Sequence, residues 1–318
     1  MKHKYLYPIL LFSFLIILSG CGNALSYFGM MNRSVYFMMT RPCVRNLAYG
    51  PQPQQTLDIY LPEEINETKH PVFIFIHGGG WRYGDKSYEA VLLKPYLEQG
   101  ILGVMINYRL APEFTFPDQL EDCLLALQWV YKNIKRFRGD PHDLHLAGHS
   151  AGAHLSSLVA LQSSRLRELG IPGKSLRSCV SLSGVYDLEG PFGKDILRSV
   201  NDFIADKRLK QEASPMSLVR DQGIPLSRFF FVVTGSEDLE GLVSQGRRFY
   251  DKLLSKGIPS RFLVLEGKDH AEVLQAMGQQ GSLLFQTLTP LIKKRATNEM
   301  ASLGRKTPPS SVVQSHRP

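Results

Sequence analysis

The feature that most constrains this chain is Gly148-His149-Ser150-Ala151-Gly152, a Gly-x-Ser-x-Gly motif between an apolar run and a helical pattern. The apolar run before it predicts a buried strand, and the alanines and leucines after it predict a helix. Gly148 and Gly152 stand where a tight strand-to-helix turn brings backbone too close for a Cβ atom. Such a turn exposes Ser150 Oγ above a helix N-terminus, which favours developing negative charge. The motif therefore predicts a nucleophilic serine, although a turn without chemistry can contain the same residues.

A second glycine-rich segment follows another buried strand. The continuous apolar run 72–76 is typical of a strand covered on both faces, and it leads into His77-Gly78-Gly79-Gly80-Trp81. Three successive glycines cost backbone entropy, which makes sense where N–H groups must approach a ligand closely. We therefore expect an oxyanion hole formed by the N–H groups of Gly79, Gly80 and Ala151, with His77 holding the loop. The alternative is a flexible glycine turn.

Strand and helix patterns alternate along most of the chain. Helices are predicted for 120–134, from 151 onward, for 243–256 and, as one last helix, for 271–293. Strands are predicted for 56–61, 72–76, 101–106, 144–147, 178–184, 229–235 and 261–265. This alternation predicts an α/β fold with a mostly parallel sheet and helices on both faces. Ligands of such sheets bind beyond the carboxyl ends of the strands.

An acid and an imidazole stand at the carboxyl ends of two other predicted strands. These residues are Asp238 and His270, so the chain order is serine, aspartate, histidine, as in the α/β-hydrolase fold. We expect Ser150 to be the nucleophile and His270 to be the base that takes its proton. Asp238 would orient His270 and stabilise the imidazolium.

Other side chains near these positions compete for the same roles. Glu237 and Asp187 are alternatives to Asp238 as the acid. His149 and His154 adjoin the serine in sequence, but the turn directs them away from Oγ, so neither is expected to be the base.

The N-terminus has the pattern of a signal sequence over residues 1–20. Lys2 and Lys4 precede an apolar run, residues 6–18, that is short for a membrane span. The run ends in Leu18-Ser19-Gly20-Cys21, which resembles the lipobox of bacterial lipoproteins. The resemblance implies lipidation at Cys21, cleavage before it, and a lipid anchor to a membrane of the bacterial cell envelope. An uncleaved N-terminal anchor and an ordinary secretory peptide remain alternatives.

Composition divides the rest of the chain into three segments, the second of which contains an insertion. Residues 22–44 are predicted to be an N-terminal helical or cap segment. The aromatic and methionine residues of this segment belong to a pattern that continues to residue 48. That pattern favours a core helix buried on two sides over a helix that contacts lipid. Residues 45–293 are predicted to form the catalytic domain, with 190–227 inserted as a small cap. Residues 294–318 have the composition of a disordered basic tail.

The charge and the cysteines exclude several classes of function. The net charge of +8 comes almost entirely from Lys2, Lys4 and the segment 293–318, so the predicted domain lacks the basic surface of a nucleic-acid-binding protein. The four cysteines show no Cys-x-x-Cys spacing, which indicates neither a zinc site nor a redox pair. Cys123 and Cys179 lie in apolar segments and are predicted to be core residues. We expect no metal and no cofactor, whereas the pairing of Cys43, Cys123 and Cys179 and the oligomeric state are left open by the sequence.

Taken together, these segments resemble the α/β-hydrolase carboxylesterases. The closest resemblance is to the branch of hormone-sensitive-lipase-like esterases, kynurenine formamidases and isoprenylcysteine methylesterases. The segments that carry it are Leu57-Asp58-Ile59-Tyr60-Leu61-Pro62, His77-Gly78-Gly79-Gly80-Trp81, Asn107-Tyr108-Arg109-Leu110-Ala111-Pro112-Glu113, Gly148-His149-Ser150-Ala151-Gly152, Ser183-Gly184-Val185-Tyr186-Asp187-Leu188 and Asp269-His270.

The resemblance implies an activity and a substrate class. The chain would hydrolyse small or short-acyl carboxylic esters through a Ser-His-Asp triad and an acyl-enzyme, without metal or cofactor. An amidase or formamidase of the same fold is one alternative. A binding lipoprotein that keeps the fold without its chemistry is another.

Overall fold

The computed structural model describes residues 21–62, 69–219 and 228–293, with the backbone alone for 21–28. The predicted signal sequence 1–20, the side chain of Cys21, the last residues of the predicted cap (220–227) and the predicted tail 294–318 therefore lie outside the described parts. No helix in the described ranges is long and apolar enough to cross a membrane.

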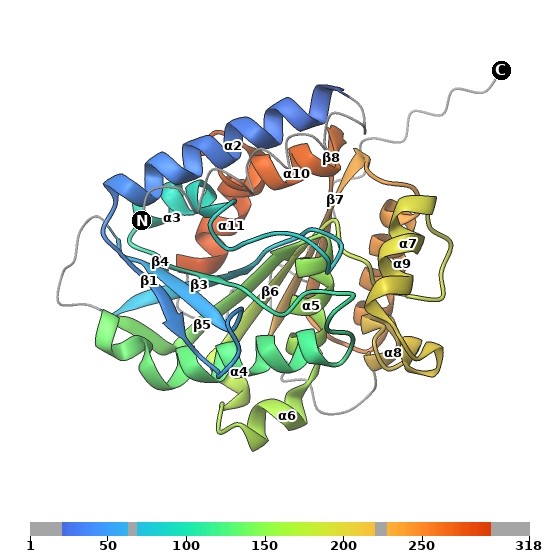
Figure 1. Cartoon of the computed structure of the whole chain (residues 1–318), viewed down its shortest axis with the longest axis horizontal. Helices are drawn as coiled ribbons and strands as arrows, with labels where there is room; N and C mark the ends of the chain where they lie inside the picture. Colours follow the sequence, from blue (N-terminus) through green and yellow to red (C-terminus); the bar gives the residue numbers. More distant parts are fainter. Residues whose placement is uncertain (1–20, 63–68, 220–227, 294–318) are drawn as a thin grey trace.

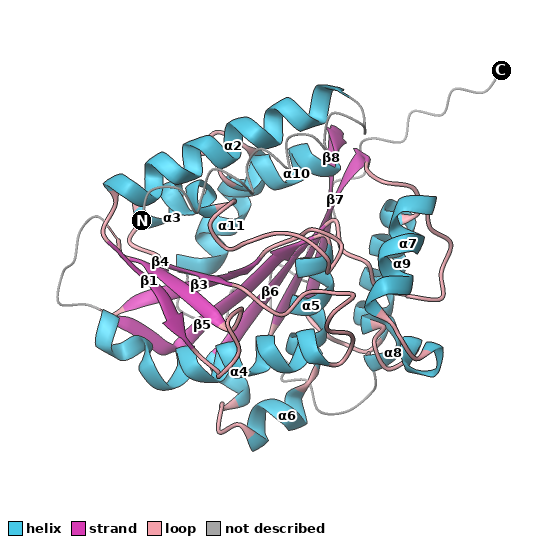
Figure 2. Ribbon diagram, in the orientation of Figure 1, coloured by secondary structure: helices cyan, strands magenta, loops and turns pink. Residues whose placement is uncertain are grey.

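A single twisted sheet forms the centre of the protein (Figure 2). Its strands lie in the order β1-β2-β4-β3-β5-β6-β7-β8, in which β1, β2 and β4 pair antiparallel and every other neighbouring pair is parallel. The strands are β1 (Cys43–Ala48), β2 (Thr56–Tyr60), β3 (His70–Ile76), β4 (Leu102–Ile106), β5 (Gly139–His149), β6 (Leu176–Leu182), β7 (Phe229–Glu237) and β8 (Ser260–Asp269). The mostly parallel α/β sheet predicted from the alternating patterns is confirmed.

Helices cover both faces of the sheet (Figure 1). One face packs against α4 (Asp118–Asn133), α5 (Ala151–Leu161) and α9 (Leu242–Ser255). The other packs against α2 (Cys21–Thr40), the 3₁₀ helix η1 (Ala90–Leu93), α3 (Lys94–Leu97), α10 (His270–Met277) and α11 (Leu283–Lys293). Strand side chains alternate between the two cores, for example Ile74 in one and Phe75 in the other. Each such side chain stabilises the fold by about 1.5–3 kcal/mol, which explains why the strands are continuous apolar runs.

The predicted cap is helical in its described part. It contains α7 (Lys194–Phe203), the 3₁₀ helix η4 (Lys207–Lys210) and α8 (Pro215–Leu218). The remaining short helices, which connect other elements, are η2 (Ile134–Phe137), α6 (Ser163–Glu168) and η3 (Gly173–Ser175).

The N-terminal helix differs from its prediction in length and in burial. The predicted helical or cap segment is 22–44, within a pattern that continues to residue 48, but α2 ends at Thr40 and β1 begins at Cys43. Strand β1 forms because Cys43–Ala48 pair with β2 at the edge of the sheet, a long-range contact that local composition does not reveal. Among the side chains described, α2 also buries one side instead of two, since Met30, Met31, Ser34 and Phe37 are buried while Tyr36 and Met39 are exposed.

The predicted last helix, 271–293, is two helices, α10 and α11, separated at Gly278–Ser282. Gly278 ends α10. Its backbone passes close to Leu92, because a Cβ atom at Gly278 would lie 2.7 Å from Leu92 Cδ2 and 3.1 Å from Leu92 Cα. The chain thus turns where it meets η1, and α11 packs separately over the sheet.

Candidate active site

Ser150 lies in a strained turn between β5 and α5. Its backbone angles are φ 55° and ψ −118°, a combination that is costly for a residue with a Cβ atom. The Ser150 N–H donates to the carbonyl of Leu182 at 2.9 Å, which ties the turn to the neighbouring strand. A Cβ atom at Gly148 would overlap the backbone of Gly152, and one at Gly152 would overlap the carbonyl of Ile76. The geometric need for both glycines, predicted from the motif, is confirmed.

The structure joins His270 to Asp238 at the carboxyl ends of β7 and β8. His270 Nδ1–H donates to Asp238 Oδ1 at 2.7 Å. The Asp238 side chain is fully buried and that of His270 is 20% exposed. With Nδ1 donating, the neutral ring presents Nε2 as its acceptor. Of the three acids left open by the sequence, Asp238 is the one bonded to His270.

The other two acids have different partners. Glu237 is exposed in β7 and lies opposite Asp269 of β8. Asp187 forms an ion pair with Arg248 at 3.5 Å.

Asp238 is held as a carboxylate by several donors. Burial by itself raises its pKa, but the hydrogen bond and charge of His270 and the hydrogen bond from Ser183 outweigh that effect, so its pKa lies below the ordinary value. Ser183 Oγ–H donates to Asp238 Oδ2 at 2.5 Å, and the N–H groups of Gly235 and Leu239 donate at 3.2 and 2.8 Å. The carboxylate is therefore fixed in position and charged at neutral pH.

His149 connects the serine turn to the histidine segment. Its Nε2–H donates to the backbone carbonyl of His270 at 2.9 Å, and the two ring centroids are 4.4 Å apart. Burial, and then the neighbouring charge of His270, lower the pKa of His149 to about 3. His149 is therefore neutral at physiological pH, and it holds the segment of His270 beside the residue that precedes Ser150.

The glycine loop lies against Ser150. A Cβ atom at Gly78 would be 3.4 Å from Ser150 Cβ, so the backbone of the loop passes directly beside the serine. Gly79 and Gly80 have φ of 112° and 61°, which glycine adopts without strain. Ala151 is the first residue of α5, where a helix N–H has no partner within the helix. The three residues predicted for the oxyanion hole are thus on the two segments that flank Ser150.

His77 and Tyr108 support the start of this loop. His77 Nδ1–H donates to the carbonyl of Gly78 at 2.8 Å, and its ring stacks on Tyr108 with centroids 4.4 Å apart. The Tyr108 hydroxyl donates to the carbonyl of His77 at 3.1 Å. Burial lowers the pKa of His77, so the ring stays neutral. The predicted role of His77 in holding the loop is confirmed.

His154 links the loop to the cap. It accepts a hydrogen bond from Trp81 Nε1–H at 3.2 Å and donates from Nε2 to the carbonyl of Ala213 at 2.7 Å. Burial lowers its pKa to about 4, which agrees with a neutral ring that accepts at one nitrogen and donates at the other. Trp81 also stacks on Phe203 of α7 at 4.5 Å, and Arg82 pairs with Asp202 of α7 at 2.9 Å.

Sequence reasoning missed Ser183 and these cap contacts. Ser183 was expected to be an ordinary strand residue, but it follows β6 at φ 52° and its hydroxyl reaches Asp238. Its place in Ser183-Gly184, at the carboxyl end of a predicted strand, was the one available signal. The contacts of Trp81 and Arg82 with α7 had no local signal, because they join segments that are far apart in the sequence.

Among the described residues, the cysteines are thiols and the side chains that could bind a metal are dispersed. Cys43, Cys123 and Cys179 are free thiols, and the last two are buried as predicted. Within the described ranges, no group of three or more His, Cys, Asp or Glu side chains is arranged to hold a metal ion.

Comparison with known proteins places this arrangement in a family. The model of the BD-FAE family matches residues 57–253, which include the glycine loop, the serine turn and Asp238. The chain belongs to the BD-FAE family. The eight-stranded sheet and its covering helices are those of an α/β-hydrolase.

Two curated relatives and one solved structure illustrate the similarities of this BD-FAE chain. It is 29% identical to a probable isoprenylcysteine alpha-carbonyl methylesterase of Oryza sativa subsp. japonica, over 75% of the chain and 59% of the relative. It is 30% identical to esterase LipC of Mycobacterium tuberculosis, over 66% of the chain and 54% of the relative. Esterase B of Lactobacillus rhamnosis superimposes with a TM-score of 0.68 at 19% identity, over 92% of this chain and 99% of that one. The chain thus spans between about half and three fifths of these two curated relatives.

Proposed function

We propose that this protein hydrolyses carboxylic esters through a Ser150-His270-Asp238 triad. The observation that carries the proposal is the bond between His270 and the buried Asp238, on a segment that His149 fastens beside the Ser150 turn. A serine hydroxyl is a weak nucleophile until a base removes its proton, and with Nδ1 bonded to Asp238 the imidazole of His270 has Nε2 left for that task. The names of the curated relatives, which are esterases, support the same reaction class.

The reaction would proceed in two acyl-transfer steps. Ser150 Oγ attacks the ester carbonyl carbon while its proton passes to His270 Nε2, and the carbonyl oxygen becomes an oxyanion. The N–H groups of Gly79, Gly80 and Ala151 would stabilise that charge. The C–O bond then breaks, and the alcohol leaves with the proton from His270. Water, deprotonated by His270, attacks the acyl-enzyme to release the acid and restore Ser150.

We propose small or short-acyl esters as the substrate class. The cap contacts the glycine loop closely, since a Cβ atom at Gly80 would lie 2.7 Å from Ser199 Oγ of α7. Side chains of α7 therefore limit the space next to the proposed oxyanion hole, which disfavours bulky groups on that side.

Labelling with a fluorophosphonate probe tests the nucleophile. The full chain should be labelled, Ser150→Ala should not be, and the buried-serine control Ser157→Ala on the same helix should be labelled normally. If Ser150→Ala is labelled as strongly as the unsubstituted chain, Ser150 is not the nucleophile. Absence of labelling in the folded unsubstituted chain would favour a binding protein without chemistry.

A set of p-nitrophenyl esters of increasing acyl length tests the substrate class. Turnover should fall as the acyl chain lengthens, and His270→Ala should reduce it by orders of magnitude. An N-formyl anilide assayed in parallel tests the formamidase alternative. One similarity favours that alternative, namely 26% identity to the kynurenine formamidase of Drosophila melanogaster over 73% of the chain and 76% of the relative. Faster turnover of the amide than of every ester would favour it.

We also propose that the protein is a lipoprotein of the bacterial cell envelope, anchored through Cys21. This rests on the sequence of the first 21 residues. Mass spectrometry of the N-terminal peptide should show an acylated Cys21, and Cys21→Ser should abolish the modification. An intact, unmodified N-terminus at Met1 would favour an uncleaved anchor.

A further inference from the structure

Helix α2 has an unusual composition for a helix at the protein surface. Among its 20 residues Arg33 is the one charged residue, and no acidic residue occurs. Helices of this kind normally place charged side chains on the face that meets water. Besides the polar Asn32, Arg33 and Thr40, α2 exposes three apolar or aromatic side chains: Val35 by 45%, Tyr36 by 72% and Met39 by 78%. These three residues lie within two helical turns and form one apolar strip, which we call the α2 strip.

Cationic groups surround the α2 strip. Arg33 is exposed on α2 itself. Arg41 directly follows α2, and Lys94, the first residue of α3, lines the same cavity as Arg41. Arg41 and Lys94 lie 3.9 and 3.8 Å from the carboxylate of Glu98. Basic side chains therefore lie on the helix of the strip and beside Tyr36.

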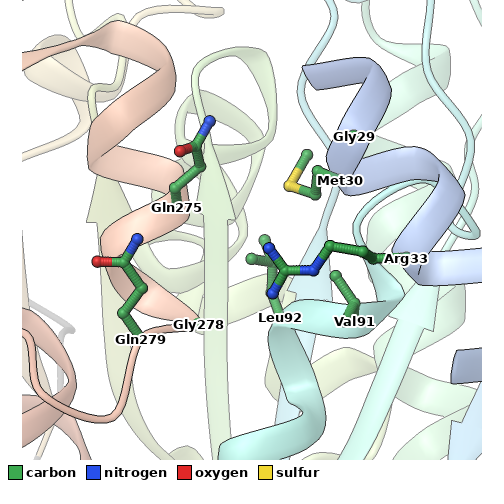
Figure 3. Close-up of a pocket in the computed structure, with 8 residues that line it drawn as sticks. All are labelled: Gly29, Met30, Arg33, Val91, Leu92, Gln275, Gly278 and Gln279. Atoms are coloured by element: carbon green, nitrogen blue, oxygen red, sulfur yellow. The ribbon is translucent and has the colours of Figure 1, made fainter. Parts of the chain in front are cut away.

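Two cavities lie where α2 meets η1, beside the strip, and Arg33 and Val91 line both. The smaller, of about 160 Å³, lies between α2, η1 and α10 and is lined by Met30, Leu92 and Gln275 among others. Figure 3 shows Arg33 extending from α2 past Val91 and Leu92 into this gap, with Gln275 and Gln279 on the opposite wall. The larger, of about 440 Å³, lies between α2 and the segment of η1 and α3, and is lined by Tyr36, Phe37, Arg41 and Lys94 among others. Both combine apolar walls with a guanidinium group.

We infer that the α2 strip docks on the surface of an anionic phospholipid bilayer. Apolar and aromatic side chains flanked by cations, on a helix without acidic residues, match the boundary between headgroups and acyl chains. Tyr36 would place its ring in that boundary with its hydroxyl toward water. The exposed guanidinium of Arg33 is complementary to anionic headgroups, and the two cavities that it lines can receive phosphate groups.

The sequence of the residues that precede α2 agrees with a bilayer as the partner of the strip. Residues 1–20, with the apolar run, join α2 directly at Cys21, the residue predicted to be lipidated. A helix rises about 1.5 Å per residue, so the strip begins about 20 Å from Cys21 along the helix axis. An anchor at Cys21 and the α2 strip could therefore contact one bilayer at the same time, with α2 lying along its surface.

Quenching of a tryptophan by brominated lipid tests the contact. Tyr36→Trp places a reporter on the strip, and Leu254→Trp places a matched reporter at an exposed position of α9, on the other face of the sheet. The full chain is mixed with phosphatidylcholine vesicles that contain brominated phosphatidylcholine, with or without phosphatidylglycerol. The unsubstituted chain supplies the background from Trp81 and Trp129. Any N-terminal anchor is common to all variants, so differences report on the substituted position.

We expect strong quenching at position 36, increased by phosphatidylglycerol, and none above background at position 254. Adding Arg33→Glu to Tyr36→Trp should weaken partitioning onto anionic vesicles at least about five-fold, because each basic group near such a surface contributes a factor of that size. Equal quenching at both positions, or none at position 36, would overturn the proposal. A Tyr36→Trp emission already shifted to the blue without lipid, together with a dimer in sedimentation, would assign the strip to a second copy of the chain and also overturn it. Ser150→Ala should leave the quenching unchanged, which separates this proposal from the proposed hydrolase.

Discussion

The hydrogen bond from Ser183 to Asp238 should contribute to turnover although Ser183 stands behind the carboxylate. Its hydroxyl donates to Asp238 Oδ2 at 2.5 Å, while His270 bonds Oδ1 at 2.7 Å. Ser183→Ala removes this donor and leaves Asp238 with the donors His270, Gly235 and Leu239. We therefore expect the carboxylate to become less fixed and less stabilised as an anion, without leaving its place.

The expected loss of kcat in Ser183→Ala follows from the charge of the Asp238 carboxylate that accepts the hydrogen bond. A hydrogen bond to a charged group contributes about 1.5–3 kcal/mol, which corresponds to a factor of roughly 10 to 150. Because three donors remain, we expect Ser183→Ala to lower kcat by about 10- to 50-fold. KM should stay nearly constant, since Ser183 acts through Asp238 and does not touch the substrate.

Ester hydrolysis by two variants and one background separates this role from a structural one. Ser183 has φ 52°, so Ser183→Gly removes the same hydroxyl while relieving the backbone. Both substitutions should reduce kcat alike, and both should have little further effect in an Asp238→Asn background, because the two residues act as a unit. Equal losses in both backgrounds, or an unchanged kcat in Ser183→Ala, would refute the reasoning.

Three further predictions concern the same region. Asp238→Asn should reduce kcat by about 10⁴-fold, because His270 would then adopt the wrong tautomer. Glu237→Gln changes an exposed neighbouring residue and should alter kcat less than two-fold in the same ester assay. The pKa of His154 is about 4 in the folded protein and about 6.5 in an unfolded chain, so the unfolded state binds more protons as the pH falls from 6.5 towards 4. This histidine should therefore contribute a fall of roughly 3 kcal/mol in the free energy of unfolding over that interval, in addition to the fall from His149, whose pKa is also lowered, to about 3. His154→Gln should remove its share and make the slope shallower in urea titrations at stepped pH, and an unaltered slope would contradict the assignment. Trp81→Phe keeps an aromatic ring but removes the indole donor at 3.2 Å, so it should lower kcat several-fold, while Trp129→Phe should not; equal effects of the two substitutions would assign the loss to general destabilisation.

The sequence was sufficient for features that depend on local patterns. Continuous apolar runs such as 72–76 predicted strands because a parallel sheet buried on both faces requires them. The glycines around Ser150 predicted the tight turn, because only residues without a Cβ atom fit where strand and helix backbones nearly touch. The positions of Asp238 and His270 after predicted strands were enough to expect them at one edge of the sheet.

What the tertiary structure decided depends on contacts between segments far apart in the chain. The choice of Asp238 over Glu237 follows from which carboxylate faces His270 once β7 and β8 pair, and the role of Ser183 follows from the adjacency of β6 and β7. The sequence also did not predict that α2 buries only one side, because methionine and aromatic side chains can either pack against protein or be exposed on the second side of a helix. Side-chain periodicity specifies which residues can be buried, but only the packed chain specifies what covers them.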